Sequence, residues 1–191
     1  MDILQVITQE LGVQKWQVEA AVKLIDEGNT IPFISRYRKE ATGTLNDEQL
    51  RNLNERLTYL RNLEDKKNQV LSSIEDQGKL TEELKAQILA AQTLVVVEDL
   101  YRPYRPKRRT RATIAKEKGL EGLADVLRLQ MTKKPLAEEA AAYISEEKGV
   151  LTTADAIAGA GDILAEAISD EADYRSYIRK ATLDEGQLLS E

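Results

Sequence analysis

The sequence predicts an all-α fold, a multi-helix bundle with one long spine helix and helix-turn-helix-like packing. Apolar residues recur at three- and four-residue spacing almost everywhere along the 191 residues. Glycines and prolines interrupt this pattern at intervals of one helix length. The run from Leu94 to Val97 could also be a buried strand, but no second strand candidate exists to pair with it, and a lone strand is not stable.

The first three helices are expected to be short, over about residues 2–11, 16–28 and 30–42. Gly12 and Gly28 end the first two, because glycine readily leaves the right-handed helical conformation. Pro32 falls in the first turn of the third helix, where a missing backbone N–H is tolerated. The third helix ends before Gly43.

A long helix is predicted over about residues 47–77, capped by Asn46 or Asp47 and stopped by Gly78. Its length is about 45 Å at 1.5 Å per residue, which suits a spine for the other helices. Glu64 and Lys67 interrupt its apolar stripe, which argues against a free coiled coil. The apolar residues of that stripe are Leu50, Leu53, Leu57, Leu60, Leu71 and Ile74.

The second half of the chain is also expected to be helical. Pro103 and Pro106 make residues 102–110 a non-helical loop, after which Thr110 caps the next helix. We expect domains at 1–150 and 151–191, the latter leading towards further domains. The helices are predicted near 81–93, 94–101, 110–119, 120–129, 136–145 and 153–179.

The composition makes catalysis improbable. The chain contains no cysteine and no histidine, which removes disulfides, thiolate and imidazole chemistry, and nearly all zinc sites. We therefore expect no enzyme, no cofactor and no metal site. Neither a membrane-spanning apolar run nor a signal-peptide pattern is present, so the sequence predicts a cytoplasmic protein with no membrane partner.

One segment is strongly basic although the whole chain carries −6. Residues 101–118 hold eight basic residues and one acidic residue, a net +7, which leaves −13 for the remainder. Stiff proline-containing backbone with arginines and interleaved tyrosines is typical of sequence-tolerant nucleic-acid binding. The alternative is that the arginines lie against the protein's own carboxylates and that Tyr101 belongs to the core. The candidate residues are Tyr101, Arg102, Tyr104, Arg105, Lys107, Arg108, Arg109 and Arg111.

A smaller basic group, Arg36, Arg38 and Lys39, is a secondary candidate on the third helix. Helix-turn-helix packing could present it to a groove of nucleic acid. The simpler interpretation, which we favour, is that the charges are solvated while Ile31, Phe33 and Ile34 anchor the helix. Spacing alone does not establish helix-turn-helix geometry.

The glycines of GAGDILAEAI, residues 159–168, outline a helix–hairpin–helix turn that could bind phosphate. Asp162 near the start of the following helix would repel a phosphate. We therefore favour a tight turn between helices at this point.

Two stretches, NTIPFISRYRKEATGTL and DLYRPYRPKRRTRATIAKEKGLE, resemble the N-terminal region of the Tex family of bacterial transcription accessory proteins. The resemblance implies helix-turn-helix-like packing here, followed by RNase H-like, helix–hairpin–helix and OB-fold modules outside this chain. It implies a function in transcription and binding of RNA or DNA with little sequence preference, with transcription machinery as a further partner. The alternative function is a structural and protein-interaction scaffold, with nucleic-acid binding left to the downstream domains.

Overall fold

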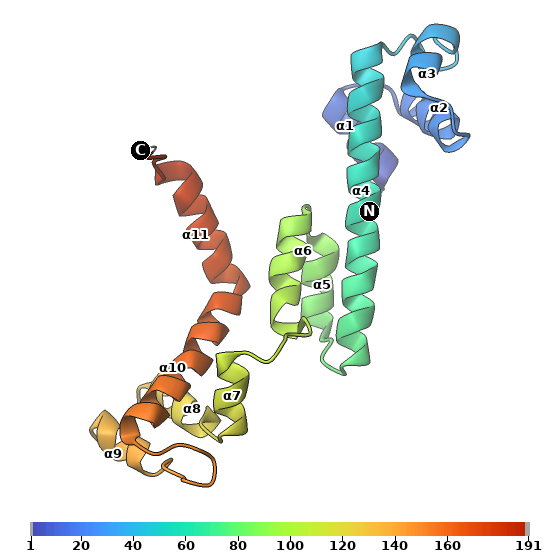
Figure 1. The fold of residues 1–191 in the computed structure, drawn as a ribbon. Helices are drawn as coiled ribbons and strands as arrows, with labels where there is room; N and C mark the ends of the chain where they lie inside the picture. The colour runs from blue at the N-terminus through green and yellow to red at the C-terminus, as the bar shows by residue number, and fades with distance from the viewer. Residues whose placement is uncertain (1, 190–191) are drawn as a thin grey trace. The chain divides into compact units, whose positions relative to one another are not determined.

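The computed structural model describes residues 2–189, and the regular elements of this part of the chain are helices (Figure 1). The all-α prediction is confirmed; an isolated antiparallel bridge joins Ser145 and Val150. Contacts divide the chain after Leu80 into two compact units, 1–80 and 81–191, and each is described by itself. The predicted division after residue 150 falls inside the second unit.

The first unit contains α1 (Ile3–Leu11), α2 (Lys15–Asp26), α3 (Ile31–Tyr37) and α4 (Asp47–Asp76). The side chain of Asn46 caps α4 and exchanges hydrogen bonds with Gln49, which satisfies donors that the first turn leaves open. The expected extension of α3 to residue 42 was wrong. The Thr42 hydroxyl instead donates to the carbonyls of Arg38 and Lys39, and this local bonding competes with continued helix.

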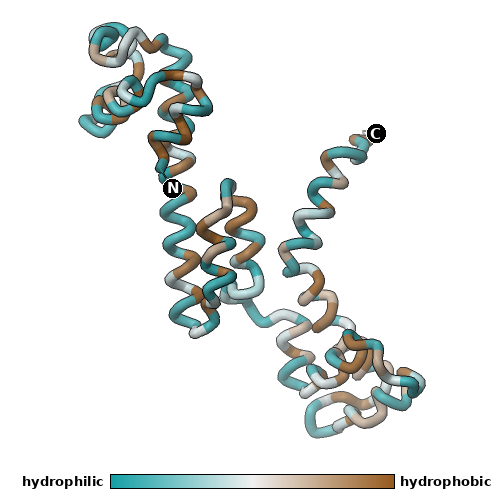
Figure 2. The backbone as a smooth tube through the Cα atoms, turned by 180° about the vertical axis from the view of Figure 1, so that it is seen from behind, coloured by the Kyte–Doolittle hydropathy of each residue, from teal (hydrophilic) through white to brown (hydrophobic). Residues whose placement is uncertain are grey.

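The long helix α4 is the spine of the first unit, as predicted. Hydropathy alternates along it (Figure 2), and helices α1, α2 and α3 all contact it. Two bidentate ion pairs reinforce the packing, Arg56 with Glu10 of α1 and Arg61 with Asp26 of α2. The buried stripe of α4 consists of Leu50, Leu53, Leu57, Leu60, Leu63, Lys67, Val70 and Ile74.

Lys67 lies on this buried stripe and is only 1 % exposed. Its ammonium group donates to Glu64 at 3.0 Å, one turn earlier on α4. Burial alone raises the pKa of the Glu64 carboxyl, but the hydrogen bond from Lys67 helps to outweigh it, so the pKa is lowered. The two charged residues that interrupt the apolar pattern in the sequence are therefore a pair.

The second unit begins with α5 and α6, which pack together, and its later helices gather around α10. The expected helix over 153–179 is broken, because Glu171 has extended backbone between α10 and α11. The helices are α5 (Glu82–Ala90), α6 (Leu94–Tyr101), α7 (Arg111–Glu117), α8 (Glu121–Leu129), α9 (Leu136–Ala141), α10 (Thr153–Asp170) and α11 (Ala172–Glu185).

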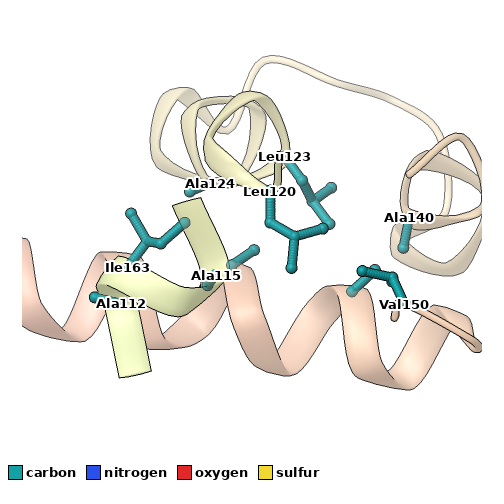
Figure 3. Close-up of a cluster of buried hydrophobic side chains, with 10 residues drawn as sticks. Ala112, Ala115, Leu120, Leu123, Ala124, Ala140, Val150 and Ile163 are labelled. Carbon is teal, nitrogen blue, oxygen red and sulfur yellow. The ribbon is translucent and has the colours of Figure 1, made fainter. Parts of the chain in front are cut away.

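The core around α10 is built mainly from small side chains (Figure 3). Ala112 and Ala115 of α7 and Leu120 and Leu123 next to them pack towards α10. The expected tight turn at residues 159–161 was wrong, since α10 runs through both glycines. Gly159 lies at a helix contact instead, where an added Cβ would clash with the Leu120 side chain. The glycine permits close helix packing rather than a change of direction.

Within residues 2–189, none of the helices combines the length and the apolar character required to cross a lipid bilayer.

Candidate nucleic-acid interface

The basic segment, residues 101–111, links α6 to α7 (Figure 1). After α6 it forms a single 3₁₀ turn, η1 (Arg102–Tyr104), and then extended backbone at Arg105. Pro103 suits the first positions of that turn because its φ angle is already fixed. The Thr110 side chain then accepts a hydrogen bond from the Thr113 amide and begins α7, as predicted.

Two cations of the basic segment, Arg102 and Lys107, face α10 and are called the inner cations. Arg102 Nε donates to Asp170 Oδ1 at 2.8 Å, and Lys107 Nζ donates to the other oxygen of the same carboxylate. Lys107 also lies 3.5 Å from Glu166. Asp170 is only 7 % exposed, so its charge needs these partners. The inner cations therefore hold the segment on α10.

The other cations are exposed and are called the outer cations: Arg105, Arg108, Arg109 and Arg111. Three of them have carboxylate neighbours, which are Glu98 at 3.9 Å, Glu117 at 2.6 Å and Asp162 at 3.6 Å. The side chain of Arg111 is 86 % exposed in its pair. Exposed pairs of this kind contribute about 0–1 kcal/mol, so a phosphate could replace the carboxylate at small cost. Arg108 is exposed and has no ion pair in the described part of the chain.

The two tyrosines of the basic segment, Tyr101 and Tyr104, are partly buried, and each takes part in an intramolecular interaction. Their rings are therefore less accessible to a stacking base than the sequence suggests. The participation of the eight candidate residues in nucleic-acid binding stays a prediction.

A hollow of about 500 Å³ lies beside the basic segment. Its wall carries both acidic and basic side chains. The acidic ones are Glu98, Asp99, Glu166 and Asp170, and the basic ones are the inner cations, Arg175 and two outer cations, Arg105 and Arg108. A phosphate inside it would face these carboxylates, and the cations of the wall other than Arg108 already have a carboxylate neighbour. The outward surface of the segment is therefore the part suited to phosphate contact.

A second carboxylate, Asp99 of α6, is also buried, with 6 % of its surface exposed. Arg175 Nε and Arg179 Nη2 of α11 each donate to it at 2.7 Å. Burial by itself raises the pKa of Asp99, but the two arginine hydrogen bonds outweigh burial, so the pKa is lowered. Sequence reasoning missed this clamp. The sequence offered one signal for it: an acidic residue, Asp99, follows an apolar run, and Arg175 and Arg179 are four residues apart, as on one face of a helix.

The secondary candidates lie at the end of α3 and beyond it. Arg36 is on the helix, Arg38 is its C-terminal cap, and Lys39 lies in the following turn, so the placement of all three on one helix was wrong. The three side chains are exposed and have no ion pair in the part of the chain that is described. The helix-turn-helix docking of this group stays a prediction.

The anchor of α3 also differs from the expected one. Ile34 is fully buried, but Phe33 is 36 % exposed. The guanidinium of Arg38 lies over the Phe33 ring, 5.5 Å from its centroid, and Tyr37 lies beside that ring at 5.4 Å. Phe33 therefore supports a surface cluster of aromatic and basic groups rather than the core.

These features define an all-helical region with a fixed basic segment and a second, unpaired basic group. Residues 1–75 match the Tex-like protein N-terminal domain, and residues 130–191 match the Tex central region-like family. The chain belongs to the Tex family and corresponds to the N-terminal region of its members.

The curated relatives agree with this assignment. The transcriptional accessory protein Tex of Neisseria gonorrhoeae is 47 % identical over 98 % of this chain, which covers 24 % of that protein. The uncharacterized protein YdcI of Bacillus subtilis is 47 % identical over 97 % of the chain, which covers 26 % of it. The human S1 RNA-binding domain-containing protein 1 is 32 % identical over 93 % of the chain, which covers 18 % of it. The chain thus spans about a quarter of the length of its bacterial relatives.

Proposed function

We propose that this region belongs to a transcription accessory protein that binds RNA or DNA with little sequence preference, and that the outer cations of the basic segment contact phosphates. The observation that carries this proposal is their exposure on a segment that the inner cations fix to α10. A fixed backbone reduces the entropy that is lost on binding. Arginine–phosphate contacts carry no sequence information, which accounts for the broad preference.

The proposal assigns different functions to residues that look alike in the sequence. Arg102 and Lys107 brace the fold, while Arg105, Arg108, Arg109 and Arg111 bind phosphate. Tyr101 and Tyr104 support the segment from within rather than stack on bases. The region acts without catalysis, in the cytoplasm, and transcription machinery is its further partner.

The proposal is tested by fluorescence anisotropy. Labelled single-stranded and duplex RNA and DNA are titrated with the chain at several salt concentrations. The variant replaces the outer cations with Gln and leaves the inner cations in place. The loss of four phosphate contacts should make the salt slope for duplex DNA shallower by roughly 3–4. The matched control replaces four exposed cations that have no ion pair among the described residues, namely Lys79, Lys85, Lys133 and Lys134.

Equal losses in the variant and the control would contradict the proposal, because binding would then depend on net charge alone. An unchanged affinity in the outer-cation variant would exclude this surface as a contact.

The alternative function, a structural and protein-interaction scaffold, is favoured by one observation. Arg102 and Lys107 are engaged with Asp170 across more than 60 residues of sequence, which is what an internal brace requires. Under this alternative, nucleic-acid binding lies in parts of the longer protein outside this chain. Absence of binding at low salt by the folded chain would support it.

A further inference from the structure

The end of α3 carries a second surface of aromatic and basic side chains, here called the α3 patch: Phe33, Arg36, Tyr37, Arg38 and Lys39. It borders a hollow of about 380 Å³, which is lined by residues 36–41 alone. One acidic residue, Glu40, lies in this stretch. The local charge is therefore positive although the whole chain is acidic.

The cations of the α3 patch have no carboxylate partner in the described part of the chain. Arg36, Arg38 and Lys39 have no carboxylate within ion-pair distance among residues 2–189, in contrast to the inner cations of the basic segment. A phosphate binding here would not have to displace a carboxylate of the protein. Charge-assisted hydrogen bonds from arginine to phosphate are among the stronger polar contacts in proteins.

One aromatic ring of the α3 patch, that of Tyr37, is accessible. Tyr37 is 63 % exposed, and its ring is tilted by 45° against Phe33. The Arg38 guanidinium covers Phe33, so Phe33 and Arg38 support each other while Tyr37 remains open to solvent. An exposed tyrosine next to unpaired cations matches the way in which proteins stack unpaired bases while they neutralise the backbone.

The backbone that carries the patch is held in place. The amides of Thr42 and Thr44 donate to the carbonyls of Arg38 and Lys39, and Thr42 is fully buried. Gln17 of α2 donates to the carbonyls of Thr42 and Gly43. Trp16 packs so closely on Gly43, whose φ is +61°, that an added Cβ would clash with its ring. The turn therefore does not need to be ordered when a ligand binds.

We propose that the α3 patch binds single-stranded nucleic acid, with a base stacked on Tyr37 and adjacent phosphates bound by Arg36, Arg38 and Lys39. This extends the proposed function, on which it rests, by adding a second contact surface and a preference for unpaired bases. A duplex offers its phosphates but not its stacked base faces, so it would use only part of the patch.

The test uses the whole 191-residue chain and three labelled probes of about 12 nucleotides or base pairs, within the range of single-strand site sizes: a U-rich single-stranded RNA, oligo-dT and a DNA duplex. The charge variant is Arg36→Gln, Arg38→Gln, Lys39→Gln, and the stacking variant is Tyr37→Ser. The charge-matched control is Lys23→Gln, Lys79→Gln, Lys85→Gln, which changes exposed cations outside both basic surfaces. Fluorescence of Trp16, the single tryptophan, verifies that the first unit remains folded.

The charge variant should weaken single-strand binding at least tenfold and make the salt slope shallower by about 2, the value for three phosphate contacts on a single strand. Tyr37→Ser should weaken single-strand binding about tenfold, leave the salt slope unchanged, and leave duplex binding unchanged. The control should bind all three probes like the unmodified chain.

The inference fails if the control loses as much affinity as the charge variant, or if Tyr37→Ser affects duplex and single strand equally. Competition by poly-glutamate at equal charge concentration would identify an acidic protein segment as the ligand instead. Loss of binding in the outer-cation variant alone would overturn this inference and leave the proposed function standing. Absence of binding by every form of the chain would overturn both.

Discussion

The basic segment and the α3 patch have similar compositions but different surroundings. Each combines arginines, a lysine and tyrosine next to a proline-containing stretch. In the basic segment, Asp170 forms ion pairs with two cations and the tyrosines are partly buried. In the α3 patch, the cations have no ion pair among the described residues and Tyr37 is open to solvent. Availability of a charge therefore depends on tertiary neighbours, which local composition does not reveal.

The different surroundings of the two basic surfaces should have their largest effect on the free energy of unfolding. Asp170→Asn removes the carboxylate charge that Arg102 and Lys107 share, so we expect the second unit to lose about 2 kcal/mol. Arg102 is 45 % exposed in its pair, which keeps the loss from being larger. The triple Gln variant of the α3 patch should change stability by no more than about 1 kcal/mol, because its side chains are exposed and only the contact of Arg38 with Phe33 is lost.

Amide hydrogen exchange measured by mass spectrometry follows each unit separately. Asp170→Asn should accelerate exchange in residues 102–110 and leave the first unit, monitored also by Trp16 fluorescence, unaffected. Unchanged exchange in the basic segment would mean that the inner cations do not brace it.

Low pH should also destabilise the second unit, but by less than Asp170→Asn does. The folded pKa of Asp99 is lowered from 3.8, since the hydrogen bonds from Arg175 and Arg179 outweigh burial. A depressed carboxyl pKa contributes stability that is fully present above the unfolded value and is lost as pH falls through the folded value. The α6–α11 contact should therefore weaken below about pH 4. Thermal unfolding followed from neutral pH down into this acid range measures the loss.

Asp99→Asn should reduce that acid sensitivity and lower the stability at neutral pH. The charge variant of the α3 patch should retain the acid sensitivity of the unmodified chain, because no carboxylate among the described residues is paired with the patch. If the Asp99→Asn variant lost as much thermal stability in acid as the unmodified chain, other carboxylates would be responsible for the loss.

The sequence predicted much of the fold because local signals decide where most helices begin. Asn46 and Thr110 cap α4 and α7 as expected. The apolar spacing of α4 correctly places Leu50, Leu53, Leu57, Leu60 and Ile74 in the core, but Leu71 is only partly buried. The errors occur where side-chain contacts override the apolar pattern, some of them local and some distant. The end of α3 depends on the buried Thr42 turn, and the break at Glu171 follows directly after Asp170, which is held by residues more than 60 positions away.

The candidate site was predictable in composition but not in arrangement. Proline and arginine content locates the basic segment, yet nothing local to it indicates that Arg102 and Lys107 face Asp170 while Arg108 faces solvent. Conversely, the solvated interpretation of Arg36, Arg38 and Lys39 agrees with their exposure, but the stacking of Arg38 on Phe33 requires the turn after Tyr37. Only the folded chain brings these groups together.

The smallest expected effect concerns α10, which carries the acidic partners of the basic segment. Gly159→Ala places a Cβ against the buried Leu120 and 3.3 Å from Ala115, so we expect a net loss of about 1 kcal/mol after the helix-propensity gain. Gly161→Ala meets nothing within 4 Å and should gain about 0.5–1 kcal/mol. Chemical denaturation monitored by circular dichroism compares the pair. Gly159→Ala should also accelerate amide exchange in residues 102–110 but not at the α3 patch, whereas equal stability changes in the two variants would contradict close packing at Gly159.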